Sequence, residues 1–223
     1  MRFVVTAGPT REFIDPVRFL SNPSTGRMGF AVARAARAAG PEVTLIAGPV
    51  ALKTPRGVRR VDVVSARDML QAVRTVIART DVLVMTAAVA DWRPARCAAR
   101  KLKKSEMSDT LKLVRNPDIL KTINRLVGSP RRGDRILIRI GFAAETGAPA
   151  AEAVRKCREK GLDLVVGNDV TARGSGFGTT TNRVTFVTPD GRVQRLPLMS
   201  KLAVARRIVS FAESAAQRKG ANA

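Results

Sequence analysis

The chain has 223 residues, 45% of them hydrophobic, which is enough for one large domain with a substantial core. Its formal net charge is +22, from 40 Lys and Arg residues against 18 Asp and Glu residues. The sequence contains no histidine, so catalysis by a histidine base, a Ser-His pair or a histidine-ligated zinc ion is excluded.

Predicted strands and helices alternate along the chain. Strands are predicted at residues 2–7, 43–47, 60–64, 82–85, 136–142 and 164–166. Helices are predicted at residues 28–39, 65–79, 148–160 and 200–215, with a further helix after residue 116. Residues 8–27 are predicted to form a long polar loop, residues 87–114 to be irregular, and residues 217–223 to be frayed.

Two helix starts carry capping signals. Ser65, with Asp68 three residues later, resembles a capping box in which Asp replaces the usual Glu. Asn116 is predicted to be an N-cap, with Pro117 at the first helical position and Asp118 in the first turn.

The alternation of strands and helices predicts an α/β fold. We expect a single domain over residues 1–223, a three-layer α/β/α Rossmann-like sandwich around a mostly parallel sheet. Residues 183–187 and 193–196 flank Pro189-Asp190-Gly191, which is a strong hairpin signal. This hairpin is too short to pack alone. It is expected either at an edge of the sheet or as a C-terminal dimer arm that reaches a second subunit.

Three loops follow predicted strands, and ligands of open parallel sheets bind beyond the carboxyl ends of strands. In the first loop, Ser24, Thr25, Gly26 and Gly29 precede a helix, where backbone amides and the helix dipole favour an anion. Glycine also lets the backbone approach a phosphate closely. The loop matches neither GxGxxG nor GxxxxGKS, so an ordinary glycine-bearing turn is the alternative.

The second loop contains Ala87, Ala88 and Asp91, followed by a lysine-rich run at residues 101–104. The two alanines are expected to leave backbone groups accessible to a ligand. Asp91 is suited to hold a polar ligand group or a metal ion, with a simple loop cap as the alternative. A solvated turn is the alternative for the lysine run.

The third loop, residues 141–146, leads to Lys156 and Lys160, which lie four residues apart in a predicted helix and share one face. Two cations on one face are unfavourable unless an anion or an acid meets them, which favours a ligand role, with a solvent-exposed face as the alternative. Together the three loops predict a site for a phosphorylated ligand.

The cysteines, the N-terminus and the lengths of the apolar segments all bear on where in the cell the protein is found. Cys97 and Cys157 fit no metal or disulfide spacing, which predicts free thiols in a reducing cytosol. The N-terminus lacks a signal-peptide pattern, and no segment approaches the roughly 18 uninterrupted apolar residues of a membrane span. We therefore expect a cytoplasmic protein that does not contact a membrane.

In combination and order, several segments resemble the phosphopantothenate–cysteine ligase (phosphopantothenoylcysteine synthetase) family, often the second half of a bifunctional coenzyme A biosynthesis protein in bacteria. The matching segments are VTAGPTREFIDPVRFLSNPSTGRMGFAVA (5–33), EVTLIAGPV (42–50), AAVADWRP (87–94), KLKK (101–104), NPDIL (116–120), GFAAET (141–146) and GND (167–169). No counterpart of the flavin-dependent decarboxylase half is present. The resemblance therefore implies a stand-alone ligase, with the decarboxylase on a separate polypeptide.

The resemblance implies a two-step reaction. The carboxylate of 4′-phosphopantothenate attacks the α-phosphate of a nucleotide, giving an acyl nucleotidate and pyrophosphate, and the cysteine amine then displaces the nucleoside monophosphate. CTP is expected as the nucleotide, as in bacterial members, with ATP as the alternative. Mg²⁺ is expected to accompany the triphosphate.

The resemblance also implies roles for single residues. Asn22 is expected to donate a hydrogen bond to the reacting acyl group, and Lys101 to be a mobile lysine that closes over the intermediate. The residues implied to bind phosphopantothenate are Ala87, Ala88, Asp91 and, from the neighbouring subunit of a homodimer, Arg18. The residues implied to bind the nucleotide are Gly8, Ser24, Gly26, Gly29, Asn116, Pro117, Asp118, Ile119, Phe142, Lys156, Lys160 and Asn168.

Two other classes of protein are alternatives. A nucleic-acid-binding protein would suit the charge, but the basic residues are spread along the chain, with one Trp and no Tyr to stack on bases. A Rossmann-type oxidoreductase would need a GxGxxG segment after the first strand, and none is present. A cleft for small polyanionic substrates accounts better for the positive charge.

Overall fold

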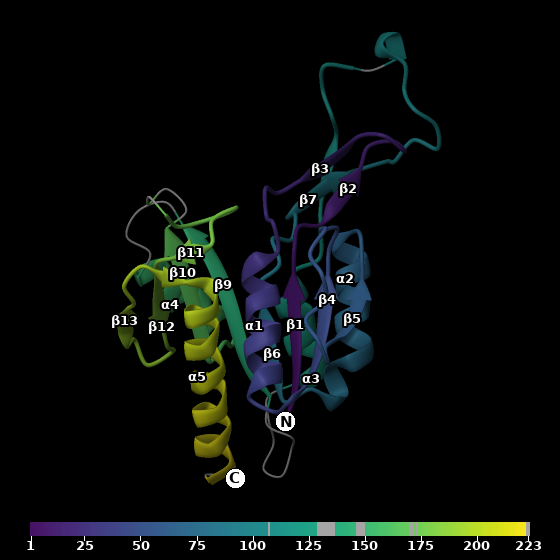
Figure 1. Cartoon of the computed structure of the whole chain (residues 1–223). Helices are drawn as coiled ribbons and strands as arrows, with labels where there is room; N and C mark the ends of the chain where they lie inside the picture. Colours follow the sequence, from purple (N-terminus) through teal and green to yellow (C-terminus); the bar gives the residue numbers. More distant parts are fainter. Residues whose placement is uncertain (107, 129–136, 146–149, 170–171, 173, 222–223) are drawn as a thin grey trace.

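The computed structural model describes residues 1–106, 108–128, 137–145, 150–169, 172 and 174–221. Its main feature is an eight-stranded sheet in the order β13-β12-β10-β9-β6-β1-β4-β5 (Figure 1). Neighbouring strands from β10 to β5 pair in parallel, whereas β12 and β13 are added in antiparallel pairings. The predicted mostly parallel sheet is confirmed.

The bounds of the elements are as follows. The strands of the large sheet are β1 (Arg2–Ala7), β4 (Glu42–Ala47), β5 (Arg59–Asp62), β6 (Val82–Met85), β9 (Ile138–Glu145), β10 (Leu164–Asp169), β12 (Val184–Val187) and β13 (Val193–Arg195). Three small pairs are β2 (Arg11–Phe13) with β3 (Phe19–Ser21), β7 (Trp92–Pro94) with β8 (Leu113–Arg115), and β11 (Thr181–Asn182) with β14 (Met199–Ser200). The helices are α1 (Arg27–Ala38), α2 (Ala66–Val76), α3 (Ile119–Val127), α4 (Ala150–Glu159) and α5 (Lys201–Ala221), with short 3-10 helices at Ile77–Arg79 and Lys104–Glu106.

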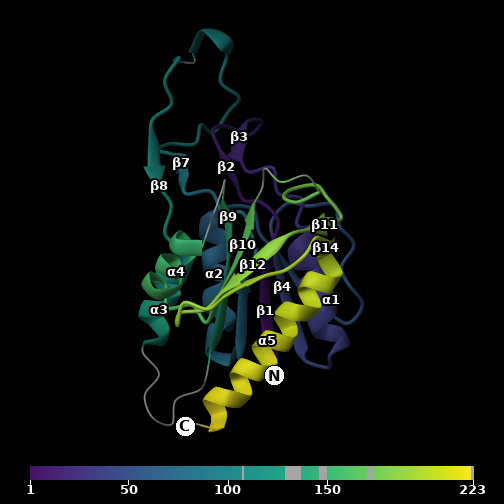
Figure 2. The same cartoon turned by 90° about the vertical axis from the view of Figure 1, so that its left-hand side faces the viewer.

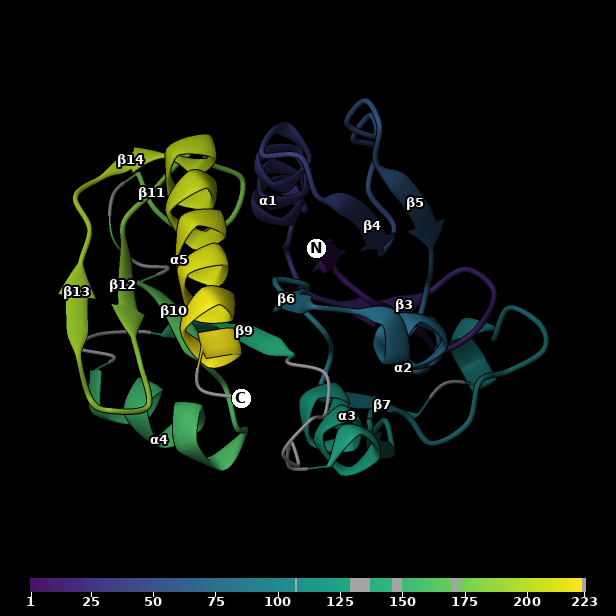
Figure 3. The same ribbon diagram turned by 90° about the horizontal axis from the view of Figure 1, so that it is seen from below.

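Successive residues of the central strands enter two separate cores. Phe3 and Val5 of β1 pack in the core that contains residues of α1 and α5, whereas Val4 packs in the core that contains residues of α2, α3 and α4. Figure 3 shows these two helix layers on opposite sides of the sheet. The expected three-layer sandwich is confirmed, and it explains why all four residues of β6 are apolar and buried.

The hairpin of β12 and β13 forms one edge of the large sheet, because β12 pairs with β10 along the register Val165↔Val187 to Asn168↔Val184. Of its two expected placements, the sheet edge is the observed one, and its contact with a second subunit stays a prediction. A different segment projects from the body, beyond the carboxyl ends of the parallel strands (Figures 1 and 2). We call this segment, residues 92–106 and 108–115, the arm.

The start of α2 is as predicted. The Ser65 side chain accepts a hydrogen bond from the Asp68 backbone N–H at 3.2 Å, and the Asp68 carboxylate accepts one from the Ser65 N–H at 2.9 Å. This reciprocal arrangement satisfies two amides that the first turn of a helix leaves without partners.

The start of α3 differs from its prediction. The N-cap is Asp118, whose carboxylate accepts a hydrogen bond from the Lys121 N–H at 3.0 Å, and Asn116 lies outside the helix. The Asn116 amide instead donates to the Ala90 carbonyl at 2.8 Å. Asn and Asp are about equally good caps, so local propensity does not choose between them, and the contact with the loop after β6 does.

Other boundaries also differ. The polar loop predicted at residues 8–27 contains the β2–β3 pair. The end predicted to be frayed is helical to Ala221, because α5 continues and its Lys219 forms an ion pair with Asp163 at 2.7 Å. The predicted starts at residues 136 and 148 lie outside the described residues.

Both cysteines are free thiols, Cys97 exposed and Cys157 buried. Burial raises the pKa of Cys157 to about 11. Within the part of the chain that the structure describes, no helix has the length and apolar character needed to cross a bilayer.

Candidate functional site

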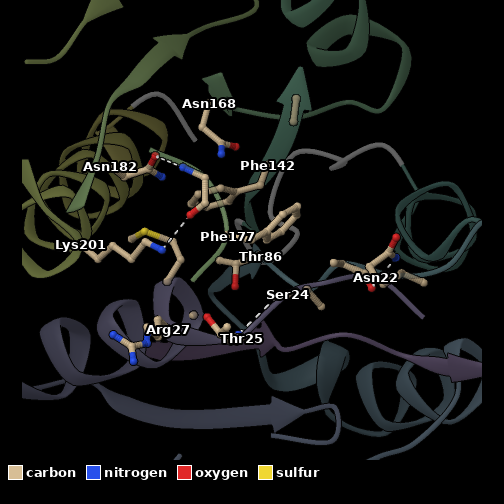
Figure 4. A pocket seen from close by; sticks show the side chains of 18 of the residues that line it. Asn22, Ser24, Thr25, Arg27, Thr86, Phe142, Asn168, Phe177, Asn182 and Lys201 are labelled. Carbon is tan, nitrogen blue, oxygen red and sulfur yellow. Dashed lines mark hydrogen bonds between the residues drawn. The ribbon is translucent and has the colours of Figure 1, made fainter. Parts of the chain in front are cut away.

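A pocket of about 450 Å³ opens at the carboxyl ends of β1, β6, β9 and β10 (Figure 4). Strand β1 has β4 on one side and β6 on the other, so the chain reverses its direction of winding at this point, where open α/β sheets bind ligands. The lining residues are Asn22, Ser24, Thr25, Gly26, Arg27, Met28, Gly29, Thr86, Ala87, Ala88, Val89, Asp91, Phe142, Ala143, Lys156, Asn168, Gly176, Phe177, Asn182 and Lys201.

A second pocket of about 220 Å³ adjoins the first, and the two share Ala87, Val89, Asp91 and Phe142. Its remaining lining residues come mainly from the start of α3 and include Asn116, Pro117, Asp118, Ile119 and Lys160. The structure therefore brings together, at one edge of the sheet, all the residues expected to bind substrate or nucleotide except Gly8, Arg18 and Lys101.

Gly8 supports the first loop from behind and lines neither pocket. Gly8 and Gly26 have positive φ angles of 78° and 75°, which favour glycine. A Cβ atom on Gly26 would lie 3.3 Å from the Gly8 nitrogen, and one on Gly8 would lie 3.0 Å from a methyl group of Val50. The two glycines therefore allow the loop to fold closely over the end of β1.

Gly29 has a packing role in addition to its place in the pocket wall. A Cβ atom there would lie 2.5 Å from the Ala7 Cβ and 2.5 Å from the Thr86 Oγ1. Gly29 thus allows α1 to approach β1 and β6 closely, in addition to lining the pocket. The N-cap of α1 is Gly26, which offers no side-chain cap, and the first-turn residues Arg27, Met28 and Gly29 line the pocket. An uncapped helix start of this kind is suited to an anion.

Ala87 and Ala88 line the pocket, but the expectation that their backbone groups are accessible is wrong for three of them. The Ala88 N–H donates to the Gly8 carbonyl at 2.9 Å, and its carbonyl accepts from the Thr10 N–H at 3.2 Å. The Ala87 N–H donates to the Thr6 hydroxyl at 3.2 Å. The alanines instead provide space, because a larger side chain would fill the pocket.

Asn22 is half-buried in the pocket wall. Its Nδ2 donates to the Ala88 carbonyl at 3.1 Å, which orients the amide and ties the first loop to the second. An amide nitrogen carries two hydrogens, so a second N–H remains for a ligand.

Lys156 and Lys160, near the end of α4, line different pockets. Lys156 in α4 lines the larger pocket with Phe142 and Asn168. Lys160 lines the smaller pocket, and its Nζ lies 3.1 Å from the Asp118 carboxylate. An acid therefore meets Lys160, which offsets part of the repulsion between two neighbouring cations.

Arg18 and Lys101 lie together in a separate cavity of about 710 Å³ at the base of the arm. The carboxylate of Asp15, fully buried, accepts a hydrogen bond from the Arg18 Nε at 3.0 Å and one from the Leu102 N–H at 3.2 Å. The Arg18 guanidinium also donates to the Leu102 carbonyl at 2.9 Å. The adjacent guanidinium holds the pKa of Asp15 well below its ordinary value.

Sequence reasoning missed the part of the pocket that comes from residues 176–201. Gly176, Phe177, Asn182 and Lys201 line one side of it. The sequence did contain one signal, Lys201 in the first turn of a helix. A cation at that position interacts unfavourably with the helix dipole, which indicates that another contact compensates for it.

The family described as "DNA/pantothenate metabolism flavoprotein C-terminal domain" matches residues 1–215. The chain belongs to this family. It is 47% identical over 207 residues to the coenzyme A biosynthesis bifunctional protein CoaBC of Bacillus subtilis strain 168, covering 92% of this chain and 49% of that protein. It spans about half the length of the curated relatives it matches.

Solved structures share the fold. The crystal structure of the C-terminal domain of CoaBC superposes with a TM-score of 0.78 at 45% identity, covering 97% of this chain and 98% of that domain. A Cab2 mutant in complex with phosphopantothenate-cysteine has a TM-score of 0.76 at 17% identity, covering 99% and 88% of the two chains. The Cab2 structure shows that proteins of low sequence identity share this fold.

Proposed function

We propose that the protein joins 4′-phosphopantothenate to cysteine through an acyl nucleotidate, with CTP as the nucleotide. The observation that carries this proposal is the position of Asn22 beside the uncapped start of α1, in a pocket that also contains Lys156 and adjoins Lys160. The 45% identity to the CoaBC C-terminal domain supports it. The resemblance of the sequence to bacterial ligases favours CTP.

In the first step, a carboxylate oxygen of phosphopantothenate attacks the α-phosphorus, and the bond from that phosphorus to the oxygen of the β-phosphate breaks to release pyrophosphate. The start of α1 stabilises phosphate charge through its free amides and dipole. In the second step, the cysteine amine attacks the acyl carbon, and the bond to the phosphate oxygen breaks to release CMP. The free N–H of Asn22 stabilises the charge that develops on the acyl oxygen.

The residues present fit a magnesium ion that arrives with the triphosphate. Mg²⁺ usually takes one or two carboxylates together with phosphate oxygens and water. Asp91 lines both pockets and supplies one carboxylate. The residues that the structure describes contain no cluster of three or more His, Cys, Asp or Glu side chains that would hold a metal ion by themselves. When bound, the ion would neutralise charge on the phosphates.

Arg18 and Lys101 are proposed to act on the pocket of a second chain, in a homodimer. They line neither of these two pockets and instead share a separate cavity with other residues of the arm. Most charged residues of the arm are Lys or Arg, which suits contact with a phosphorylated ligand.

Mixing two inactive variants tests this arrangement. Arg18→Ala chains keep an intact Asn22, and Asn22→Ala chains keep an intact Arg18. If Arg18 acts on the other chain, an equal mixture that has re-equilibrated regains about one quarter of wild-type activity, because half the dimers have one complete site. If Arg18 acts within its own chain, the mixture stays inactive.

The activity itself is tested with purified protein, phosphopantothenate, cysteine and each nucleotide in turn, by measuring pyrophosphate release and product mass. Release with CTP and much less with ATP is expected. Release with ATP alone would show that the nucleotide substrate is ATP and not CTP. No release with either nucleotide would overturn the proposal. Tight binding of DNA or RNA at physiological salt without ligase activity would favour the nucleic-acid alternative. That a separate polypeptide carries the decarboxylase stays a prediction.

A further inference from the structure

Lys201 is a buried cation in the wall of the larger pocket. It is the first residue of α5, is only 7% exposed, and lies beside Asn182 and the Gly176–Phe177 segment (Figure 4). Its Nζ donates to the Gly176 carbonyl at 3.0 Å. No carboxylate among the described residues forms an ion pair with it, in contrast to Lys160 and Lys219.

A buried ammonium group without an anion is unfavourable, because the loss of its hydration is not offset by an ion pair. Burial, and then the charge of Arg27, lower the pKa of Lys201 below its ordinary value. An ammonium has three N–H donors, and the Gly176 carbonyl takes one. Both the charge and the remaining donors would be satisfied by an anion in the pocket.

The position of such an anion follows from the positions of Asn22 and Lys201. Figure 4 shows them at opposite sides of the pocket, with Ser24 and Thr25 between them. In the proposed reaction the α-phosphate must meet the carboxylate held at Asn22. The phosphates beyond it then extend along the start of α1 toward Lys201, and the dipole of this 12-residue helix favours their charge.

We propose that Lys201 binds the terminal phosphates of the nucleoside triphosphate, the part that leaves as pyrophosphate; this inference rests on the proposed function. Negative charge grows on the β-phosphate as its bond to the α-phosphorus breaks, and a fixed cation at this end stabilises it. The monophosphate that remains after the first step does not reach Lys201. Lys201 therefore contributes to the binding affinity for the triphosphate and not to that for the monophosphate.

The test compares a nucleotide with and without its terminal phosphates, and the triphosphate without its nucleoside. Titration calorimetry measures binding of CTP, CMP and inorganic tripolyphosphate to the wild type and to Lys201→Met, which keeps the chain length without the charge. We expect affinity for CTP and for tripolyphosphate to fall about 10- to 100-fold, and affinity for CMP to change by less than about twofold. Equal losses for CTP and CMP, or unchanged CTP binding, would overturn the proposal.

The matched control is Lys219→Met, the same change at the far end of the same helix, about 27 Å away along its axis. It should leave all three affinities unchanged. Thermal unfolding without ligand should show Lys201→Met to be as stable as the wild type or more so, because a buried unpaired charge is removed. If that variant does not fold, Lys201→Gln, which keeps an N–H donor for Gly176, provides the same comparison.

Failure of this inference differs from failure of the proposed function. A wild-type protein that makes the ligase product, together with a Lys201→Met variant that keeps its affinity for CTP, would overturn the inference alone. A wild-type protein that releases no pyrophosphate with either nucleotide, but binds tripolyphosphate through Lys201, would overturn the ligase and leave a polyphosphate site.

Discussion

The buried carboxylate of Asp15 holds the guanidinium of Arg18 against the backbone of Leu102, at the base of the arm. The carboxylate bonds to the Arg18 Nε at 3.0 Å and to the Leu102 N–H at 3.2 Å, and the guanidinium bonds to the Leu102 carbonyl at 2.9 Å. Because Lys101 precedes Leu102, one buried acid positions both residues that are proposed to act on a second chain. The pair also joins the turn between β2 and β3 to the arm.

Asp15→Asn is expected to lower stability in a pH-dependent way. The pKa of Asp15 is depressed in the folded state, so its ionised form contributes stability above the ordinary Asp value of about 3.9, and that stability is lost as the pH falls from there toward the folded pKa. Thermal unfolding should therefore show a deficit for Asp15→Asn at pH 7 that narrows below about pH 4.

The control for Asp15 is Asp109→Asn, which changes an exposed acid on the arm. It should unfold like the wild type at every pH. A deficit for Asp15→Asn that stays constant from neutral to acidic pH would show that charge is not the cause.

Asn22→Ala is expected to separate the two half-reactions. Pyrophosphate release in the absence of cysteine should be nearly normal, whereas coupling to cysteine should slow about 100-fold or more, so that the acyl nucleotidate accumulates. Rapid quench followed by mass measurement detects the intermediate. Equal slowing of both steps would contradict the role given to this amide.

Lys101→Gln is expected to slow formation of the intermediate about tenfold or more without loss of stability, because the side chain is exposed on the arm. Single-turnover pyrophosphate release measures the rate, and thermal unfolding measures stability. Lys112→Gln, which changes another exposed lysine of the arm, serves as control and should keep the wild-type rate. A wild-type rate for Lys101→Gln would exclude this lysine from the site.

Gly29→Ala is expected to reduce the free energy of unfolding by about 1–3 kcal/mol, because the added methyl group overlaps Ala7 and Thr86. Gly220→Ala, in α5, adds the same methyl group where nothing lies within 4 Å of it, and should raise this free energy by less than about 1 kcal/mol. Urea unfolding measures both. Equal stability of the two variants would show that α1 can move away from the sheet without cost.

The sequence by itself determined the order of the elements and the place of most ligand-binding loops. Apolar runs, the capping box at Ser65 and the glycines of the first loop act through neighbours only a few residues away, so their patterns can be recognised locally. The general rule for open sheets then placed the three loops at the carboxyl edge. The pockets formed there include Asn22, Asp91 and Phe142 as expected.

Only the tertiary structure decided which residues meet from distant parts of the chain. Asn116 and Asp118 are equal candidates for a cap until the loop after β6 takes the Asn116 side chain. Arg18 and Lys101 lie near each other in space and away from the pocket of their own chain. Lys201 enters the pocket because α5 packs beside α1, a contact between segments far apart in sequence that no local pattern encodes.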